Sequence, residues 1–303
     1  MRREKIISLL LMLAALSAIS GLALITAFIF KEGLPIMVKA GLGEFILSSN
    51  WYPTEGEFGI FPMIVGSLAV TAGAMIIGVV FGLACAVLLT QFSPPRLVAI
   101  VKPSIELLAG IPSVVYGFMG VVILVPFIRD TLGPAMVSLH LASDPGPGLS
   151  VLAASIVLGI MVLPTITSIS VDALQAVPRS YREGSLALGA TEWQTTHRVL
   201  LRAARSGIVA AIILGMGRAV GETMAVIMVA GNMAALPHSI LDPVRTLTTN
   251  IALEMSYASS KPPGYSHRNA LFATGVVLFV IIMILNTIAM AMSRRGGLGR
   301  KRK

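Results

Sequence analysis

Two charged side chains interrupt a long apolar run in the last third of this 303-residue chain. Arg218 and Glu222 are the only charged residues between Ile208 and Gly231. A charge at the depth of a bilayer costs at least about 2.5–3.5 kcal/mol, so both side chains must face protein or water. A guanidinium keeps its charge and offers a planar fork of donors that matches two oxygens of an oxyanion. These residue types at this depth therefore indicate a path for an anion.

The spacing of the two charges leaves a second interpretation open. At i and i+4, Arg218 and Glu222 are predicted to share one helix face and to neutralise each other at rest. Gly217 and Gly221 have a small-xxx-small spacing which, together with Gly215, lets another backbone come close. The alternative is a structural Arg–Glu pair that joins helices inside a bundle. A combined role is also open, in which the pair closes the path until an anion competes for Arg218.

Hydroxyl side chains follow Pro164 in the preceding apolar run: Thr165, Thr167, Ser168 and Ser170. Hydroxyls can satisfy the carbonyl groups that a proline frees, so a kink with a hydrated lining is one expectation. Plain packing is equally compatible. Glu106 lies near the end of another run, where a carboxylate can simply be interfacial.

The long polar segment from Pro178 to Gly207 is predicted to form two short helices. Pro178 suits a first helical position, and Gly189 suits the left-handed residue that ends a helix. Thr191 and Gln194 have the spacing of a capping box that starts the second helix. One basic stripe at i, i+4 and i+7 is expected on that helix: Arg198, Arg202 and Arg205. An elbow of this shape between membrane spans suits a docking element, and the alternative is an amphipathic helix bound to lipid headgroups.

The elements that position these residues are apolar helices. Hydrophobic residues make up 55% of the chain, charged residues 12%, and the mean hydropathy is +0.87, which indicates a membrane protein. The net charge of +9 comes from basic residues beside apolar runs, without interleaved aromatics, so nucleic acid is not expected as a partner. The one cysteine, Cys85, excludes an internal disulfide.

Six runs are long enough to cross about 30 Å of hydrocarbon. They are Ile6–Phe30, Met63–Gln91, Ser104–Ile128, Ser150–Val171, Ile208–Gly231 and Ala270–Met292. The first run is too long for a signal-peptide core, so it is predicted to be an uncleaved span. Sixteen Lys and Arg residues fall on the side of the two termini and six on the other, which predicts that both termini and the elbow are cytoplasmic.

Three parts are expected along the chain. Residues 1–62 form a first helix and an outer segment, residues 63–292 form a core of five spans with the elbow at about 174–207, and residues 293–303 form a basic cytoplasmic tail. The second outer segment, Arg129–Leu149, is rich in Gly and Pro and is predicted to be a loop. Residues 224–236 are apolar enough to re-enter the membrane, so the end of the fifth span is left open.

No motif for chemistry on a nucleotide or a metal is present. No lysine is followed by Ser or Thr, so the chain has no phosphate-binding loop of the Gly-x-x-x-x-Gly-Lys-Ser/Thr kind. The histidines are scattered and have no metal-site spacing: His140, His197, His238 and His267. No nucleophile–base pair stands out, so neither a catalytic nor a metal site is expected, and an enzyme is the least favoured class.

The elbow resembles the EAA loop of ABC importer permeases. Glu183-Gly184-Ser185, Gly189 and then Val199-x-Leu201 follow the pattern of that loop, with Gly-Ser in place of Ala-Ala and Arg202 in place of Pro. The resemblance implies that the first helix seats in a groove of a cytoplasmic ATP-binding subunit. The residues that it places at this contact are Arg182, Glu183, Gly184, Ser185, Leu188 and Gly189.

Three further stretches resemble phosphate-import permeases, first the PstC-type subunit and second the PstA-type. They are Phe58–Leu68, Glu106–Gly117 and Gly217–Ala225. The resemblance implies an all-α polytopic membrane protein with six transmembrane helices and the type I architecture of ABC importer permeases. It also implies that the substrate path includes Arg218, Glu222 and Thr223.

The same resemblance implies the partners. They are a second, PstA-like permease, two ATP-binding subunits that hold ATP and Mg, an external phosphate-binding protein and the lipid of a prokaryotic inner membrane; no cofactor is expected in this chain. Two rivals remain. One is an ABC permease for another oxyanion such as molybdate, sulfate or phosphonate, because an arginine does not name its anion. The other is a secondary anion transporter, against which the elbow and the absence of a strong internal repeat argue.

Overall fold

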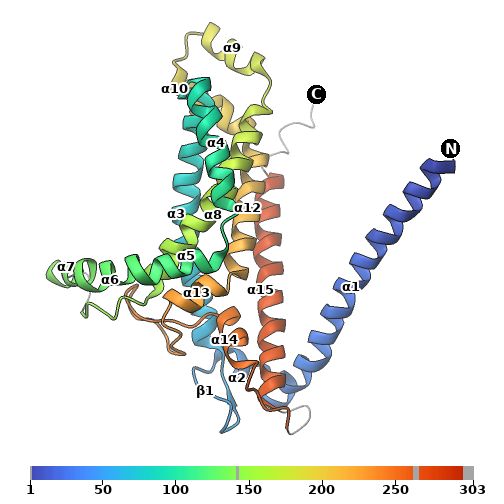
Figure 1. The fold of residues 1–303 in the computed structure, drawn as a ribbon, viewed down its shortest axis with the longest axis vertical. Helices are drawn as coiled ribbons and strands as arrows, with labels where there is room; N and C mark the ends of the chain where they lie inside the picture. The colour runs from blue at the N-terminus through green and yellow to red at the C-terminus, as the bar shows by residue number, and fades with distance from the viewer. Residues whose placement is uncertain (1, 141–142, 262–265, 296–303) are drawn as a thin grey trace. The chain divides into compact units, whose positions relative to one another are not determined.

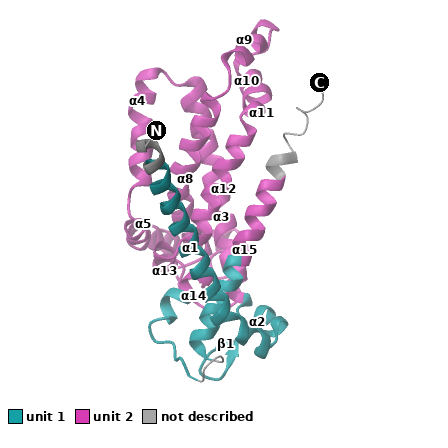
Figure 2. Ribbon diagram, turned by 90° about the vertical axis from the view of Figure 1, so that its right-hand side faces the viewer, with its two compact units in different colours: residues 1–61, 251–279 teal, residues 62–250, 280–303 magenta. Residues whose placement is uncertain are grey.

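The computed structural model describes residues 2–140, 143–261 and 266–295. In these ranges the regular secondary structure is helical apart from one short hairpin, and the chain divides into two compact units (Figures 1 and 2). Unit 1 comprises residues 1–61 and 251–279, and unit 2 comprises residues 62–250 and 280–303. The predicted basic tail, residues 293–303, lies largely outside the described residues.

Unit 1 contains α1, the hairpin and the first part of the last helix. Its elements are α1 (Arg2–Ala40), α2 (Leu42–Leu47), β1 (Trp51–Tyr52), β2 (Glu57–Phe58), the end of α14 (Leu247–Glu254) and α15 (His267–Arg295) as far as Phe279. The strands pair antiparallel, with Trp51 opposite Phe58. A Cβ on Gly33 would lie 2.8 Å from the backbone nitrogen of Ala273, so α1 and α15 touch backbone to backbone there.

A buried carboxylate ties the hairpin of unit 1 to its C-terminal segment. One oxygen of Glu254, Oε2, accepts the indole N–H of Trp51 at 2.9 Å and lies 2.7 Å from Nε2 of His267. The side chains of Glu254 and His267 are 7% and 12% exposed. This arrangement gives the aromatic segment around the hairpin a fixed core, because a buried charge is stable only when it is hydrogen-bonded.

Unit 2 is a helical bundle built around α8. Its elements, with π-helical turns marked η, are α3 (Phe61–Val87), η1 (Leu88–Phe92), α4 (Pro95–Ala109), α5 (Ser113–Met119), η2 (Gly120–Leu124), α6 (Val125–Phe127), η3 (Ile128–Leu132), α7 (Gly133–Ser138), α8 (Val151–Gln175), α9 (Arg179–Ala187), α10 (Glu192–Thr195), η4 (Thr196–Leu200), α11 (Leu201–Ala203), α12 (Arg205–Gly221), α13 (Met224–Val229), the start of α14 and the part of α15 that begins at Val280. Figure 1 shows α9 and α10 at one end of these helices and α13 toward the other.

Small residues allow α3 to approach α8 closely. A Cβ on Gly78 would lie 2.6 Å from a methyl of Val162, and one on Gly82 would lie 3.0 Å from Ile166. The hydroxyl of Thr167 also donates to the carbonyl of Gly82 across this contact, at 3.2 Å. Without a hydrophobic driving force in lipid, such close packing and interhelical hydrogen bonds hold the helices together.

Five described helices are long and apolar enough to cross a membrane, and the pair Glu192–Ala203 and Arg205–Gly221, bent by 70°, makes a sixth only if it is counted as one span. The five helices correspond to the first four predicted spans and to the sixth. The first apolar run extends from Ile7 to Ala40 instead of ending at Phe30. The third prediction is wrong in its bounds. Helix α4 ends at Ala109 and α5 starts at Ser113, because Pro112 lacks an N–H and disfavours helical geometry at Ile111.

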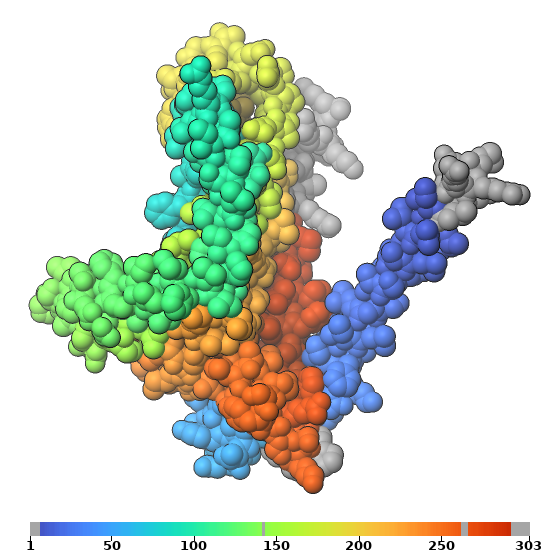
Figure 3. Space-filling view, in the orientation of Figure 1, coloured from blue at the N-terminus to red at the C-terminus, as the bar shows by residue number. Residues whose placement is uncertain are grey.

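The apolar helical run that follows this break extends to Ser138 and forms an arm crosswise to α4 and α8 (Figures 1 and 3). The prediction of a loop over Arg129–Leu149 is therefore wrong for its first half. Pro134 does not end the helix because it lies in the first turn of α7, where its missing N–H costs little.

Candidate transport site and coupling loop

The fifth span breaks beside its two charges. Helix α12 ends at Gly221, Glu222 has the extended conformation (φ −70°, ψ 131°), and α13 starts at Met224. The prediction that Arg218 and Glu222 share one helix face is therefore wrong. No ion pair joins these two side chains in the described part of the chain.

The backbone groups that the break exposes find local and distant partners. The Glu222 carboxylate accepts the N–H of Ala225 at 3.1 Å, and its carbonyl accepts the hydroxyl of Thr248 at 3.0 Å. The hydroxyl of Thr223 donates to the carbonyl of Gly221 at 3.3 Å. Helix ends leave such groups unpaired, so these side chains stabilise the interruption.

Arg218 bonds to a hydroxyl on α8. Its Nη1 donates to Oγ1 of Thr165 at 3.3 Å, and both residues are half-buried. The contact is held by close packing of α8 and α12, since a Cβ on Gly215 would lie 2.8 Å from Ile166. A guanidinium has five N–H donors, so this single bond leaves most of them available to an anion.

The glycines on either side of Arg218 do not make the expected close contacts within this chain. A Cβ on Gly217 or Gly221 would meet no described atom within 4 Å, and only Gly215 of the three lies against a neighbour. Among the described residues no neighbour approaches Gly217 or Gly221, and the close neighbour of Gly215 is the side chain of Ile166 instead of a backbone. Gly217 and Gly221 are exposed beside the guanidinium and the break.

The elbow forms as predicted in its first half. Pro178 precedes α9, Gly189 has φ +82°, and the capping box of Thr191 and Gln194 is complete, with both bonds present at 3.2 and 3.0 Å. Glycine is required at 189 because a side chain resists positive φ. Together, the turn at Gly189 and the cap at Thr191 fix the direction in which α10 follows α9.

Two side-chain contacts tie α9 to the second helix. Nη2 of Arg182 donates to both carboxylate oxygens of Glu192 at 3.0 Å, and the hydroxyls of Ser185 and Thr195 lie 2.9 Å apart. Leu188 is 90% exposed. Of the residues predicted to couple to an ATPase, Arg182 and Ser185 therefore brace the elbow. Those left outward are Glu183, Gly184, Leu188 and Gly189.

The predicted basic stripe is divided. The turn Thr196–Leu200 is π-helical, and Arg205 starts α12 beyond a bend of 70°. The i, i+4, i+7 geometry assumed one regular helix, so Arg198 and Arg202 remain on the elbow while Arg205 does not. The helix does continue past Arg202 to Ala203, as the missing proline predicts.

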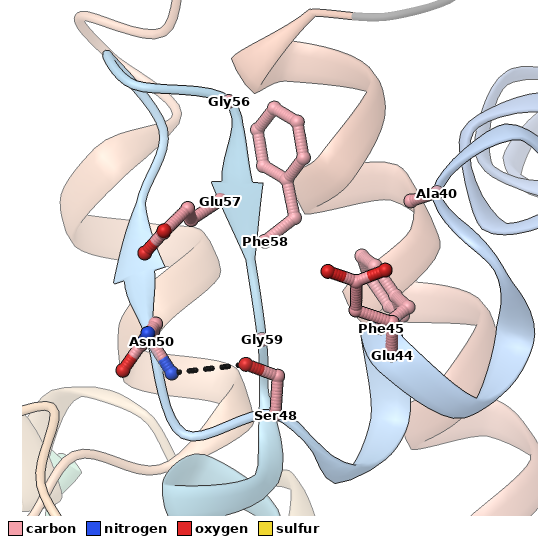
Figure 4. Close-up of a pocket in the computed structure, with 9 residues that line it drawn as sticks. All are labelled: Ala40, Glu44, Phe45, Ser48, Asn50, Gly56, Glu57, Phe58 and Gly59. Carbon is pink, nitrogen blue, oxygen red and sulfur yellow. Dashed lines mark hydrogen bonds between the residues drawn. The ribbon is translucent and has the colours of Figure 1, made fainter.

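Two of the pockets among the described residues lie in unit 1, and both are lined by carboxylates. One of about 110 Å³ lies between α2 and the hairpin and is lined by nine residues with two carboxylates, Glu44 and Glu57, and no basic side chain (Figure 4). The other, of about 610 Å³, is lined by the carboxylates of Glu55 and Glu254 together with the basic side chains of Lys261 and His267, and Glu254 is already hydrogen-bonded to His267. Among the described residues, no group of three or more potential metal-binding side chains is found.

Sequence reasoning missed the partners of the site. Thr165 stood out as a hydroxyl after a proline but was not connected with Arg218, and Glu192 and Thr195 were not connected with the elbow. Thr248 carried no signal, because its contact with Glu222 joins segments 26 residues apart.

The broken span, the elbow and the bundle define an ABC importer permease. Residues 78–296 match the family described as "Binding-protein-dependent transport system inner membrane component". The chain belongs to this family. It is thus a transport subunit of the membrane, and the predicted fold class is confirmed.

Relatives match most of the chain. A "Probable ABC transporter permease protein YqgH" of Bacillus subtilis is 42% identical, over 93% of this chain and 88% of the relative. The "Phosphate transport system permease protein PstC" of Mesorhizobium japonicum is 34% identical, over 90% and 87%. "Phosphate transport system permease protein PstC 1" of Mycobacterium bovis is 38% identical, over 80% and 75%.

Solved structures share the fold. A chain of a bacterial alginate ABC transporter, in complex with an alginate-bound periplasmic protein, superposes with a TM-score of 0.63 at 14% identity, covering 95% of this chain and 94% of that one. A chain of the MetNI methionine ABC transporter in an inward-facing conformation gives 0.57 at 22%, covering 78% and 95%. Both support the type I permease architecture and carry no information about the substrate.

Proposed function

We propose that this chain is the permease subunit of an ATP-driven importer of inorganic phosphate. The observation that carries the proposal is the agreement of PstC-named relatives over 80–90% of the chain. The geometry supports it, because a half-buried guanidinium stands beside a break in a span, with most of its donors unused. Planar donors suit two oxygens of a phosphate.

The substrate path includes Arg218, Glu222 and Thr223 in this proposal. Arg218 meets the anion. Glu222 and Thr223 hold the break open, since their side chains bond to backbone groups of α13 and α12. Helix breaks at membrane depth are tolerated where they line a water-filled cavity or are buried in protein, so the break marks the route.

The elbow transmits ATP hydrolysis in this proposal. Its outward residues, Glu183, Gly184, Leu188 and Gly189, meet an ATP-binding subunit that holds ATP and Mg, while Arg182 and Ser185 keep α9 rigid against α10. An exposed leucine such as Leu188 is a natural anchor, because burying one apolar side chain in a partner stabilises a contact by roughly 1.5–3 kcal/mol. In this proposal the nucleotide is bound by the partner subunit, since this chain has no phosphate-binding loop of the Gly-x-x-x-x-Gly-Lys-Ser/Thr kind.

The assembly contains a second, PstA-like permease, two ATP-binding subunits and an external phosphate-binding protein, with both termini of this chain in the cytoplasm of a prokaryotic cell. The orientation rests on the excess of Lys and Arg on the side of the elbow.

The test is ATP-dependent uptake by the reconstituted complex. Phosphate-loaded binding protein is expected to stimulate ATPase activity and accumulation of labelled phosphate, while the sulfate-loaded form has no effect. Equal stimulation by sulfate would assign a different oxyanion. Uptake that survives removal of ATP and collapses with an ion gradient would instead assign a secondary transporter.

A further inference from the structure

Thr165 is the hydrogen-bond partner of Arg218 in the described part of the chain. The residue follows Pro164 on α8, and its Oγ1 accepts from Nη1 of the guanidinium at 3.3 Å. The proposed substrate path of Arg218, Glu222 and Thr223 does not include this hydroxyl.

The partner is neutral, although a carboxylate lies four residues from the arginine. Glu222 bonds to the N–H of Ala225 and leaves the guanidinium to the hydroxyl. A hydrogen bond between a charged and a neutral group is weaker than the two parallel bonds that a guanidinium forms with a carboxylate or phosphate. An arriving oxyanion can therefore displace the threonine, whereas it would compete poorly with a carboxylate.

The hydroxyl is held in position by the close packing of α8 side chains against glycines of α12. Along the antiparallel contact of α8 and α12, Gly207 meets Ala173 and Gly215 meets Ile166, with added Cβ atoms at 2.4 and 2.8 Å. Helices packed this closely cannot slide without a clash. Thr165, next to Ile166, consequently presents its oxygen to Arg218 from a rigid support.

We infer that Thr165 is a positioning residue for transport. Its hydroxyl orients the Arg218 guanidinium toward the path and releases it when phosphate binds. This inference rests on the proposed function, because it acts through the arginine of the phosphate path. The competing explanation is that Thr165 serves only packing through its methyl group.

Two substitutions separate these roles. Thr165→Val keeps the shape and removes the hydroxyl, and Thr165→Ser keeps the hydroxyl and removes the methyl. In proteoliposomes that contain the complete complex, phosphate uptake is measured per assembled complex, together with ATPase activity. Thr165→Val is expected to lose about tenfold in uptake, the size expected for one hydrogen bond to a charged group, and Thr165→Ser is expected to stay within about twofold of wild type.

A matched control comes from the same helix. Thr167 donates its hydroxyl to the carbonyl of Gly82 on α3, so Thr167→Val removes a hydroxyl that serves helix packing. It is expected to lower the amount of complex and to leave uptake per complex unchanged. In an Arg218→Lys background, Thr165→Val is expected to add no further loss, because the two residues act as one unit.

Normal uptake per complex in Thr165→Val, or an equal loss in Thr165→Ser, would overturn the inference while leaving phosphate transport intact. Full additivity with Arg218→Lys would overturn it as well. If Thr165→Val fails to assemble, Thr165→Ala provides the same comparison. A wild-type complex that takes up no phosphate would overturn both the inference and the proposed function.

Discussion

Gly189 gives a test of the elbow in which the backbone alone is changed. Its φ is +82°, and an added Cβ would meet no described atom within 4 Å. A substitution therefore causes no clash, and its cost comes from the conformation. The left-handed region costs an L-residue roughly 1–2 kcal/mol, which changes a folded ratio about 5- to 30-fold. Gly189→Val exceeds this cost because β-branching resists positive φ, whereas Gly189→Asn tolerates it.

Gly184 supplies a control, because Gly184→Ala adds the same methyl group as Gly189→Ala. It lies inside α9 and, like Gly189, has open space around an added Cβ. Its φ is not positive, so Gly184→Ala is expected to stabilise α9 by about 0.5–1 kcal/mol through helix propensity. Two Gly→Ala changes five residues apart should thus change the stability of the elbow in opposite directions.

The assay compares assembled complex, ATPase activity and phosphate uptake across this series. The expected order in the melting temperature of the complex is Gly184→Ala at or above wild type, then Gly189→Asn, Gly189→Ala and Gly189→Val, with the last either poorly assembled or hydrolysing ATP without uptake. If Gly189→Val assembled and coupled like wild type, the turn would not be needed for docking, and the assignment of the elbow as the coupling element would fail.

Substitutions at four other positions test the remaining parts of the structure. Arg218→Lys keeps the charge and loses the planar fork, so uptake should fall about tenfold at normal assembly; a parallel loss of complex would favour a structural role. Glu222→Gln retains an oxygen that can accept from the Ala225 N–H and should assemble normally, whereas Glu222→Ala should not; equal yields of the two complexes would contradict this role. Thr191→Ala removes a cap worth about 0.5–2 kcal/mol, so the melting temperature of the complex should fall while the preference for phosphate over sulfate stays. Gly78→Leu adds a side chain where a Cβ already lies 2.6 Å from α8, and no assembled complex should be recovered from membranes.

Local chemistry explains what was predictable. The capping box, the left-handed Gly189 and the second, fourth and sixth spans depend on residues within one or two turns of each other, and the structure confirms them. The bounds of these elements differ from the prediction by a few residues. The break before Pro112 was also locally encoded, but the continuous hydropathy of residues 104–128 concealed it.

The interruption at Gly221–Thr223 depends on distant residues. No proline marks it, and the helical spacing of the sequence continues through it. The extended conformation of Glu222 is supported by Thr248 on α14, a contact that only the fold creates. A lone glycine in an apolar run has many possible roles, so the sequence could suggest a re-entrant stretch but not its position.

The arginine illustrates why an i, i+4 rule fails where a helix ends. On a continuous helix, Arg218 and Glu222 would form an ion pair, and an incoming anion would have to break it. Because the backbone turns at Glu222, the carboxylate caps α13 and the arginine meets a hydroxyl on α8 instead. The same six sequence positions, 218–223, then provide both a cation with unused donors and the break beside it. An anion site at membrane depth needs both the cation and the break, because the cationic side chain must stay solvated and still have donors free to bind the anion.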